Sequence, residues 1–181
     1  MRTIVIYSSL TGNTKKVGEA IFEIIQGEKK LISIEEINSL ILNNAKKIII
    51  GFWVDKGTAD ARVRKLLKSI ENKEVYFFGT LGAEPNSDHG QKVFSKVSEL
   101  CSKKNEFKGG FLCLGKVSDK LVNMMSKFPL KLVHPLTPER MARIENASSH
   151  PDLNDLKNAQ EYFSNILKSW KFLFSAFLFS I

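Results

Sequence analysis

The fold is decided by residues 2–17, which read RTIVIYSSLTGNTKKV. The β-branched run Ile4–Ile6 is followed by a turn rich in Ser and Thr, and from Val17 onward apolar residues recur at helical spacing. The stretch therefore predicts a strand, a tight turn and a helix. At a helix N-terminus the first backbone N–H groups have no intrahelical acceptor, and the helix dipole favours an anion there. The turn is a candidate phosphate-binding loop, made of Ser9, Leu10, Thr11, Gly12, Asn13 and Thr14.

An ordinary strand–helix turn with Ser and Thr capping residues is the alternative interpretation of this loop. Residues 8–14 contain four hydroxyl side chains and one glycine, which is more than a cap requires. The sequence has no G-x-x-x-x-G-K-[ST] motif and no G-x-G-x-x-G motif, so the usual triphosphate and dinucleotide loops are excluded. A single terminal phosphate monoester is the ligand that the loop fits best.

The segment Ser9–Thr14, SLTGNT, resembles the [ST]-x-T-G-x-T phosphate loop of the flavodoxin family, in the same position after the first strand. This resemblance implies FMN as the cofactor. Three further segments, 136–143, 149–152 and 158–163, are similar to a subgroup of flavodoxin-like proteins from anaerobes, some of which are associated with reductases of linear tetrapyrroles (bilins). The resemblance implies that the chain exchanges electrons with a redox partner protein, a reductase or bilin reductase.

Length and composition indicate one globular domain spanning 1–181, with 43% hydrophobic and 25% charged residues. The net charge is +8, but the lysines are scattered as pairs between apolar positions, so we expect no nucleic-acid partner. Cys101 and Cys113 fit neither a disulfide framework nor a metal site. With a first strand that starts at residue 2 and no signal peptide, we expect a cytoplasmic protein.

Apolar runs typical of buried strands alternate with amphipathic runs typical of helices. After the first strand and helix, we expect strands at 29–34, 46–51, 75–79 and 110–114 and helices at 35–44, 58–72, 87–104 and after 152. This alternation predicts an α/β fold, a three-layer αβα sandwich around a five-stranded parallel sheet in the order 2-1-3-4-5.

In that topology ligands bind beyond the carboxyl ends of the strands, so the loops after Gly51 and Gly79 are the next candidates. We expect the first loop to offer Trp53 as a flat wall for the flavin ring; the alternative is that Phe52 and Trp53 only close the core. Backbone N–H groups of the second loop can bind the polar edge of the ring. The predicted contacts in these two loops are Trp53, Val54, Asp55, Gly57, Thr80, Leu81, Gly82 and Ala83.

Two segments depart from a short flavodoxin. An insertion at about 116–151 carries four of the five prolines, and Thr137-Pro138-Glu139 has the sequence pattern of a helix start. We expect it to leave the sheet on the flavin side, where it helps to cover the ring or shapes a docking surface for one electron-transfer partner; the alternative is a structural flap. The apolar tail at about 170–181 is too short to span a bilayer. It can extend the last helix, form a dimer contact or lie on a membrane; a protein contact is our preference.

Two other functions remain open. An FMN-dependent NAD(P)H oxidoreductase acting on quinones or bilins would use the same loops, and a non-flavin interaction module would use none of them. We predict no catalytic residue and no metal site, because no nucleophile–base arrangement or ligand cluster is evident. The chemistry of an electron carrier would be that of its cofactor.

Overall fold

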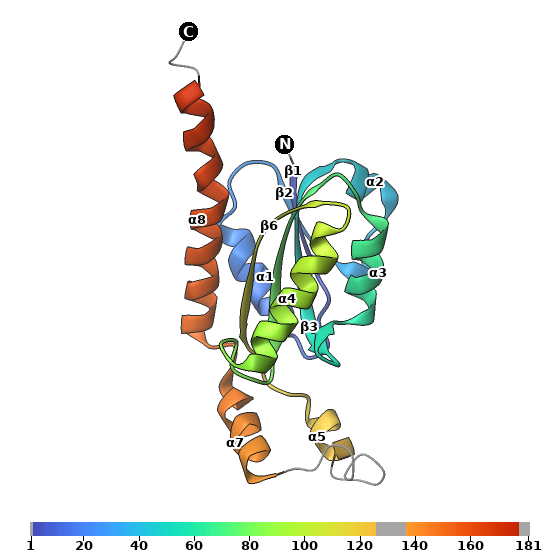
Figure 1. Cartoon of the computed structure of the whole chain (residues 1–181), viewed down its shortest axis with the longest axis vertical. Coiled ribbons are helices and arrows are strands. Elements are labelled where there is room, and N and C mark those ends of the chain that lie inside the picture. The colour runs from blue at the N-terminus through green and yellow to red at the C-terminus, as the bar shows by residue number, and fades with distance from the viewer. Residues whose placement is uncertain (1, 126–136, 178–181) are drawn as a thin grey trace.

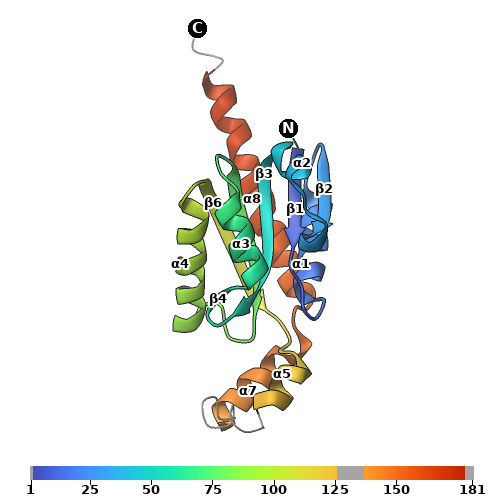
Figure 2. The same cartoon turned by 90° about the vertical axis from the view of Figure 1, so that its right-hand side faces the viewer.

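A computed structural model describes residues 2–125 and 137–177, with residues 125 and 169–177 described by their backbone alone. Five parallel strands form the sheet in the order β2-β1-β3-β5-β6 (Figures 1 and 2), which confirms the predicted order 2-1-3-4-5. Their bounds are β1 Arg2–Tyr7, β2 Lys29–Ser33, β3 Ala45–Asp55, β5 Glu74–Leu81 and β6 Glu106–Leu114. A short strand that the sequence did not predict, β4 (Thr58–Ala59), pairs antiparallel with the end of β3.

Helices cover both faces of the sheet, as predicted. α1 (Asn13–Ile24) and α8 (Leu153–Phe177) lie on one face, and α2 (Ser39–Asn43), α3 (Ala61–Ser69) and α4 (Asp88–Ser102) lie on the other (Figure 2). Alternate residues of each strand enter the two cores, because successive side chains of a strand point to opposite faces. Val5, Ile49 and Phe78 pack under α1 and α8, whereas Ile4, Ile48 and Phe77 pack under α3 and α4.

Two of the expected helices are shorter than predicted because side chains cap them internally. In place of one helix over 35–44, a 3₁₀ turn (Ile34–Glu36) precedes α2, which starts where the Asn38 side chain accepts a hydrogen bond from Ile41 N at 3.0 Å. The helix expected over 58–72 begins only at Ala61, where Asp60 supplies the N-cap.

Phenylalanines of β5 cover glycines of the strands on either side. Phe77 pairs with Gly110 of β6, and Phe78 pairs with Gly51 of β3. A Cβ atom placed on Gly51 would lie 2.1 Å from Cζ of Phe78, and one placed on Gly110 would lie 2.2 Å from Cζ of Phe77. Each glycine therefore provides the space that a buried ring occupies.

The insertion lies beyond the carboxyl ends of the strands, as expected (Figures 1 and 2). Its described parts are α5 (Asp119–Met125), α7 (Pro138–Asn146) and a 3₁₀ turn (Ala147–Ser149). Thr137 caps α7 by accepting a hydrogen bond from Arg140 N at 3.2 Å, which confirms the predicted helix start. The two ends of the insertion meet where Lys116 N donates to His150 O at 2.8 Å.

The last helix continues into the predicted apolar tail. The backbone of α8 is helical to Phe177, and its last turns extend past the amino end of the sheet (Figure 1); residues 178–181 lie outside the described residues. Among the described helices, none is long and apolar enough to cross a membrane.

Candidate functional site

The predicted phosphate loop joins β1 to α1 at the carboxyl edge of the sheet. Gly12 is the residue before α1 and has φ of +89°, a left-handed conformation that favours glycine. A Cβ atom at this position would have no atom within 4 Å, so the space in front of the glycine is open. Leu10 and Thr11 are exposed, and the Ser9 hydroxyl accepts a hydrogen bond from Lys15 N at 3.3 Å. The loop thus presents a helix N-terminus and hydroxyls to an open space.

The end of this loop is bound to β5 and to the chain after β6. Thr14 is buried, and its Oγ1 lies 2.9 Å from Oγ1 of Thr80. Asn13 Nδ2 donates to Lys116 O at 3.0 Å. The structure therefore brings together Thr14 and Thr80, which the sequence placed in two separate loops. Because the Thr14 hydroxyl is already engaged, this residue fixes the start of α1.

The loop expected after Gly51 is instead a hairpin. β3 continues to Asp55 and pairs with β4, so Trp53 and Val54 are strand residues. Trp53 lies opposite Thr80 in the sheet register, on the face of α1, whereas Val54 packs into the other core. Asp55 ends β3 and pairs with Thr58, whereas Gly57 lies in the hairpin turn. The turn lies against α4, since a Cβ atom on Gly57 would lie 3.8 Å from Cε1 of His89. Of the contacts predicted here, Trp53 is the one that lies directly opposite Thr80.

The loop after β5 contacts the insertion. Thr80 and Leu81 are the last residues of β5, and Leu81 O accepts a hydrogen bond from Gly115 N at 2.9 Å. A Cβ atom on Gly82 would lie 2.4 Å from Cγ2 of Val117, which shows how closely the chain after β6 approaches this loop. Ala83 is partly exposed.

The far end of the insertion also reaches this loop. Asn146, at the end of α7, donates to Oε1 of Glu84 at 2.8 Å. The insertion therefore borders the same edge of the sheet as the phosphate loop.

Nε1 of Trp53 is a buried donor near the phosphate loop that has no hydrogen-bond partner among the described residues. Buried donors are normally satisfied, so such a group calls for an explanation. A polar ligand at the carboxyl edge would supply the acceptor. The hydroxyl of Ser8, fully buried at the end of β1, instead faces the carboxylate of Asp60.

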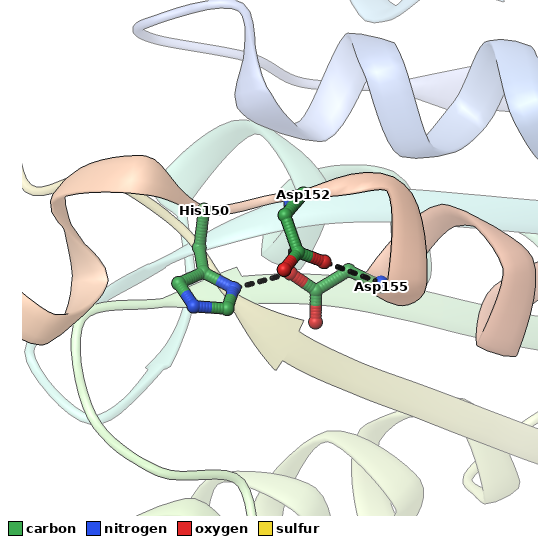
Figure 3. Close-up of side chains that lie close together, drawn as sticks. All are labelled: His150, Asp152 and Asp155. Carbon is green, nitrogen blue, oxygen red and sulfur yellow. Dashed lines mark hydrogen bonds and ion pairs between the residues drawn. The ribbon is translucent and has the colours of Figure 1, made fainter.

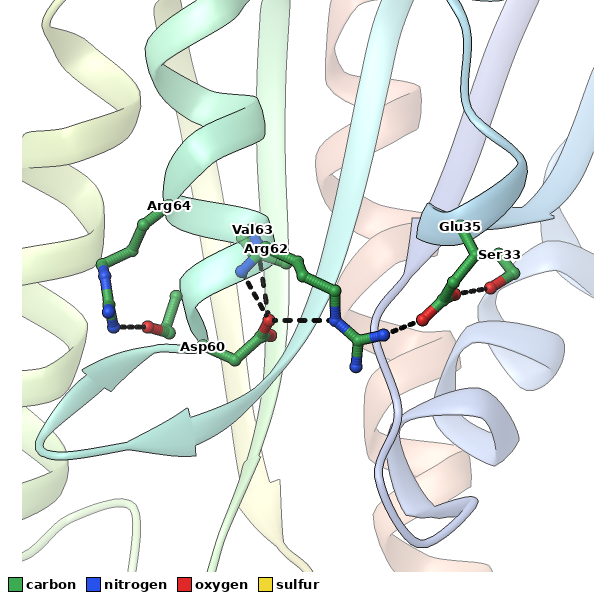
Figure 4. A network of polar contacts seen from close by, with 7 residues as sticks. Ser33, Glu35, Asp60, Arg62, Val63 and Arg64 are labelled. Carbon is green, nitrogen blue, oxygen red and sulfur yellow. Dashed lines mark hydrogen bonds and ion pairs between the residues drawn. The ribbon is translucent and has the colours of Figure 1, made fainter.

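Asp60 is a residue of this edge that the sequence analysis missed. Its side chain is 2% exposed, and Oδ1 accepts hydrogen bonds from Arg62 N at 3.0 Å and Val63 N at 3.4 Å (Figure 4). Burial raises the pKa of Asp60 above its ordinary value, and the facing Ser8 hydroxyl partly offsets the rise. The sequence pattern that could have identified it is an aspartate placed just before a helix and three residues before Val63, which is typical of an N-cap.

A polar network extends from Asp60 across the edge of the sheet. The Arg62 guanidinium lies 3.9 Å from Oδ1 of Asp60 and also pairs with Glu35 (Figure 4). Glu35 in turn accepts a hydrogen bond from Ser33, the last residue of β2. The network ties the end of β2 to the start of α3 and encloses the Asp60 carboxylate from the solvent side.

A second cluster joins His150, Asp152 and Asp155 (Figure 3), whose potential ligand atoms lie within 4.8 Å of one another. Asp155 N donates to Oδ1 of Asp152 and Asp152 N donates to Oδ2 of Asp155, both at 2.9 Å, which is a reciprocal helix cap. Oδ2 of Asp155 lies 2.5 Å from Nδ1 of His150, and this hydrogen bond raises the pKa of His150. The capping of α8 therefore accounts for the cluster.

The chain resembles solved flavodoxins in fold. A flavodoxin from the domain Archaea has a TM-score of 0.62 at 17% identity, over 94% of this chain and 99% of the other. Flavodoxin 2 from Bacillus cereus has a TM-score of 0.60 at 14% identity, over 93% of this chain and 99% of the other. A Lactobacillus acidophilus flavoprotein in complex with FMN has a TM-score of 0.51 at 20% identity, over 70% and 99%. At these identities the likeness concerns the fold alone.

Sequence comparison gives a more specific result. The flavodoxin-like domain-containing protein BilS of Clostridioides difficile is 33% identical over 178 residues, covering 92% of this chain and 97% of the relative. BilS of Clostridium symbiosum is 24% identical over 181 residues, covering 90% and 94%. The flavodoxin domain family matches residues 4–164. This match, which includes the phosphate loop and all five parallel strands except the first residues of β1, shows that the chain belongs to the flavodoxin family.

Proposed function

We propose that this chain binds FMN at the carboxyl edge of its sheet and carries electrons to or from a partner oxidoreductase. The observation that carries the proposal is the open space in front of Gly12 at the N-terminus of α1, at the same edge of the sheet as the buried Nε1 of Trp53, which has no partner among the described residues. Membership of the flavodoxin family supports a flavin as the ligand, and the TM-score of 0.51 to an FMN complex concerns the shared fold.

Each part of the edge has a defined task in this proposal. Backbone N–H groups of the loop, with the hydroxyls of Ser9 and Thr11, bind the phosphate. The Trp53 indole and the backbone of Gly82 and Ala83 border the ring. When bound, FMN supplies the redox chemistry, and the protein supplies binding and orientation. The neutral donors hold the anion without a lysine or arginine in residues 8–14.

The sharpest test compares two glycines at the ends of α1. Gly12 and Gly27 both have positive φ, +89° and +83°, and a Cβ on either would have no atom within 4 Å. Gly12→Val and Gly27→Val therefore impose similar backbone strain, but only the first lies in the phosphate loop. We expect Gly12→Val to weaken FMN binding at least 100-fold in a flavin fluorescence titration and Gly27→Val to leave it within about threefold. Equal affinities in the two variants would contradict the proposal.

Thr11 tests the hydroxyl contribution separately. Thr11→Val is nearly isosteric and exposed, so the fold should be unaffected. We expect FMN affinity to fall about tenfold, since a hydrogen bond to a charged group contributes roughly 1.5–3 kcal/mol. An unchanged affinity would show that this hydroxyl does not bind the phosphate.

A kinetic measurement separates the electron carrier from an FMN-dependent NAD(P)H oxidoreductase. We expect the purified holoprotein to oxidise NADH and NADPH no faster than free FMN, with or without a quinone acceptor. Steady turnover would identify the chain as an enzyme. A protein that takes up no FMN at all would favour the non-flavin interaction module.

The insertion is the proposed docking surface for the redox partner. Four exposed apolar side chains border the carboxyl edge: Leu10 (58% exposed) in the phosphate loop, Leu121 (39%) and Met124 (45%) on α5, and Met141 (44%) on α7. Exposed apolar residues gathered on one surface are typical of protein contacts, and methionine adapts to irregular partners. A reductase, or a bilin reductase as the sequence resemblance suggests, is the proposed partner.

Deleting residues 118–148 tests this role. We expect FMN to remain bound, because the phosphate loop and Trp53 lie outside the deletion, and electron delivery to a purified bilin reductase to be lost. Photoreduced holoprotein mixed with the reductase provides the measurement. Electron delivery that survives the deletion would leave the insertion as a structural flap.

A further inference from the structure

The positive charge of the chain is concentrated at the amino end of the sheet, opposite the candidate flavin site. The segments that enter the strands there are residue 2 and residues 26–30, 44–47, 68–74 and 103–108. Together they hold ten Lys or Arg and four Glu, a net charge of +6 out of the +8 of the whole chain. We call this surface the basic end. Its net charge of +6 compares with +2 for all the rest of the chain.

Contacts show that three of these segments form one continuous surface. Lys46 and Lys47 both approach Glu74, at 3.9 and 3.6 Å, and Lys73 Nζ donates to Ala45 O at 2.7 Å. On the other side, Lys104 pairs with Glu71 at 3.4 Å. Glu71 and Glu74 are thus already engaged by neighbouring lysines.

Four lysines of the basic end are accessible to solvent. The side chains of Lys46, Lys103 and Lys104 are 52%, 61% and 54% exposed. Lys68, in the last turn of α3, is also exposed. A ligand with diffuse negative charge can therefore contact residues 44–47, 68–74 and 103–108 together.

The apolar tail leaves the molecule at this same end. α8 runs from the carboxyl edge to Phe177, and in both views its last turns continue past the start of the strands (Figures 1 and 2). Residues 170–177, WKFLFSAF, include one Trp, three Phe and a single charged residue. Such a segment is rich in the aromatic side chains that favour the boundary between lipid headgroups and acyl chains.

We propose that the basic end and the last turns of α8 dock together on an anionic phospholipid surface. Each Lys or Arg close to an anionic leaflet contributes about 1 kcal/mol of attraction, and stable peripheral binding takes two signals, such as a basic surface with an apolar segment. Both signals are present at one end of this chain. The charge is spread over several loops rather than set in a pocket, which fits the laterally diffuse charge of a lipid surface better than an acidic protein. The carboxyl edge then faces away from the membrane.

The test is co-sedimentation of the full chain with vesicles of phosphatidylglycerol and phosphatidylcholine at a ratio of about 30 to 70. We expect binding at low salt to be at least tenfold stronger than to phosphatidylcholine alone and to weaken as salt is raised, because exposed charges are screened. Equal binding to both vesicle types, or none to either, would overturn the proposal. If the chain binds neither vesicle type, the ligand of the basic end is a protein rather than a lipid surface.

Matched charge reversals locate the surface. Lys46→Glu with Lys104→Glu changes the basic end, and Lys92→Glu with Lys120→Glu makes the same change in net charge on exposed lysines of α4 and α5 nearer the carboxyl edge. We expect the first pair to weaken vesicle binding at least tenfold and the second to change it less than threefold. Equal losses would mean that only net charge matters, which contradicts the proposed orientation.

Truncation after Lys168 tests the apolar signal, with circular dichroism to verify folding. We expect the truncated chain to lose at least nine tenths of its vesicle binding at the same lipid concentration. Undiminished binding would overturn the role of the tail. Light scattering measures the oligomeric state in the same experiment. If the full-length chain is a dimer that binds no vesicles, and truncation makes it monomeric, the tail is a protein contact and the proposal is overturned.

Discussion

A single buried hydroxyl pair, Thr14 and Thr80, connects the phosphate loop to the centre of the sheet. Both residues are at most 5% exposed, and their oxygens lie 2.9 Å apart. This contact positions the first turn of α1 relative to β5, so the amides of that turn face the open space in front of Gly12. Trp53, whose buried Nε1 lacks a partner among the described residues, lies opposite Thr80 in the sheet.

Thr14→Val should destabilise the fold by about 1–3 kcal/mol, because it leaves the buried Thr80 hydroxyl without a partner. Urea unfolding followed by circular dichroism measures the change. The double variant Thr14→Val with Thr80→Val should cost less than the sum of the two single changes, since no unpaired hydroxyl remains. Strictly additive costs would show that the two hydroxyls are not coupled.

At the scale of elements, β5 determines the packing of both cores through its two adjacent phenylalanines. Phe77 and Phe78 point to opposite faces, and each ring occupies the space over a glycine of a neighbouring strand. A tight core of this kind tolerates added volume poorly.

Gly51→Ala should therefore cost about 1–3 kcal/mol of stability, because the new methyl group meets the Phe78 ring. Phe78→Leu in the same chain should recover part of the loss by removing ring atoms. Thermal unfolding of both variants provides the measurement, with Gly27→Ala as a control for strain without steric overlap. A double variant less stable than Gly51→Ala would contradict this packing.

The cap of α8 contains a titratable contact. Asp155 raises the pKa of His150 in the folded chain, so the folded state binds this proton more tightly than the unfolded state. The added stability is fully present below the ordinary pKa of about 6.5 and is lost as the pH rises through the raised value.

His150→Gln should accordingly cost more stability at pH 5.5 than at pH 8.5. Denaturant unfolding at both pH values measures the difference, and His89→Gln, at an exposed histidine of α4, is the control. The same cost at both pH values would show that protonated His150 does not stabilise the cap.

The strands and helices that sequence could predict are those with a repeating apolar pattern. Ile48–Ile50 and Val75–Phe78 are continuous apolar runs, and their order in the sheet follows from right-handed crossovers. The hairpin at Lys56 and Gly57 was missed, because its two-residue strand has no periodicity and depends on two positive φ angles.

Prediction of the candidate site was more limited. Residues 9–14 could be singled out as a candidate phosphate loop because hydroxyls and glycine gather within one short segment, and phosphate binding there stays a prediction. The contact between Thr14 and Thr80 spans 66 residues, and the position of Asn146 beside Glu84 depends on the path of the whole insertion. Such contacts are set by tertiary packing, which local patterns do not encode.

The whole molecule has two ends with different chemistry. The carboxyl edge carries the phosphate loop, the insertion and exposed apolar side chains, whereas the amino end carries most of the net positive charge. The sheet between them is fully covered, with Ile4, Ile6, Ile48 and Ile50 at 0% exposure. The rigid centre therefore separates the two surfaces.

Hydrogen exchange should reveal this division. Amides of β1, β3 and β5 should exchange at least about 100-fold more slowly than those of α7, because no residue of α7 is buried and little apolar contact opposes its local opening. Mass spectrometry of exchanged peptides measures the ratio. Comparable protection in α7 and β3 would mean that the insertion is as firmly packed as the sheet.

The hydrogen bond between Lys116 N and His150 O, 2.8 Å long, brings the two flanks of the insertion side by side. Confining roughly 33 residues between such close ends restricts the chain by roughly 2 kcal/mol more than a four-residue Gly/Ser linker would, from the logarithmic dependence of closure entropy on length. Closing the insertion therefore costs the domain conformational entropy, and a chain with a shorter connection at this position avoids that cost. Because the cost is small, the same segment could also be grafted onto another flavodoxin at the same two flanks.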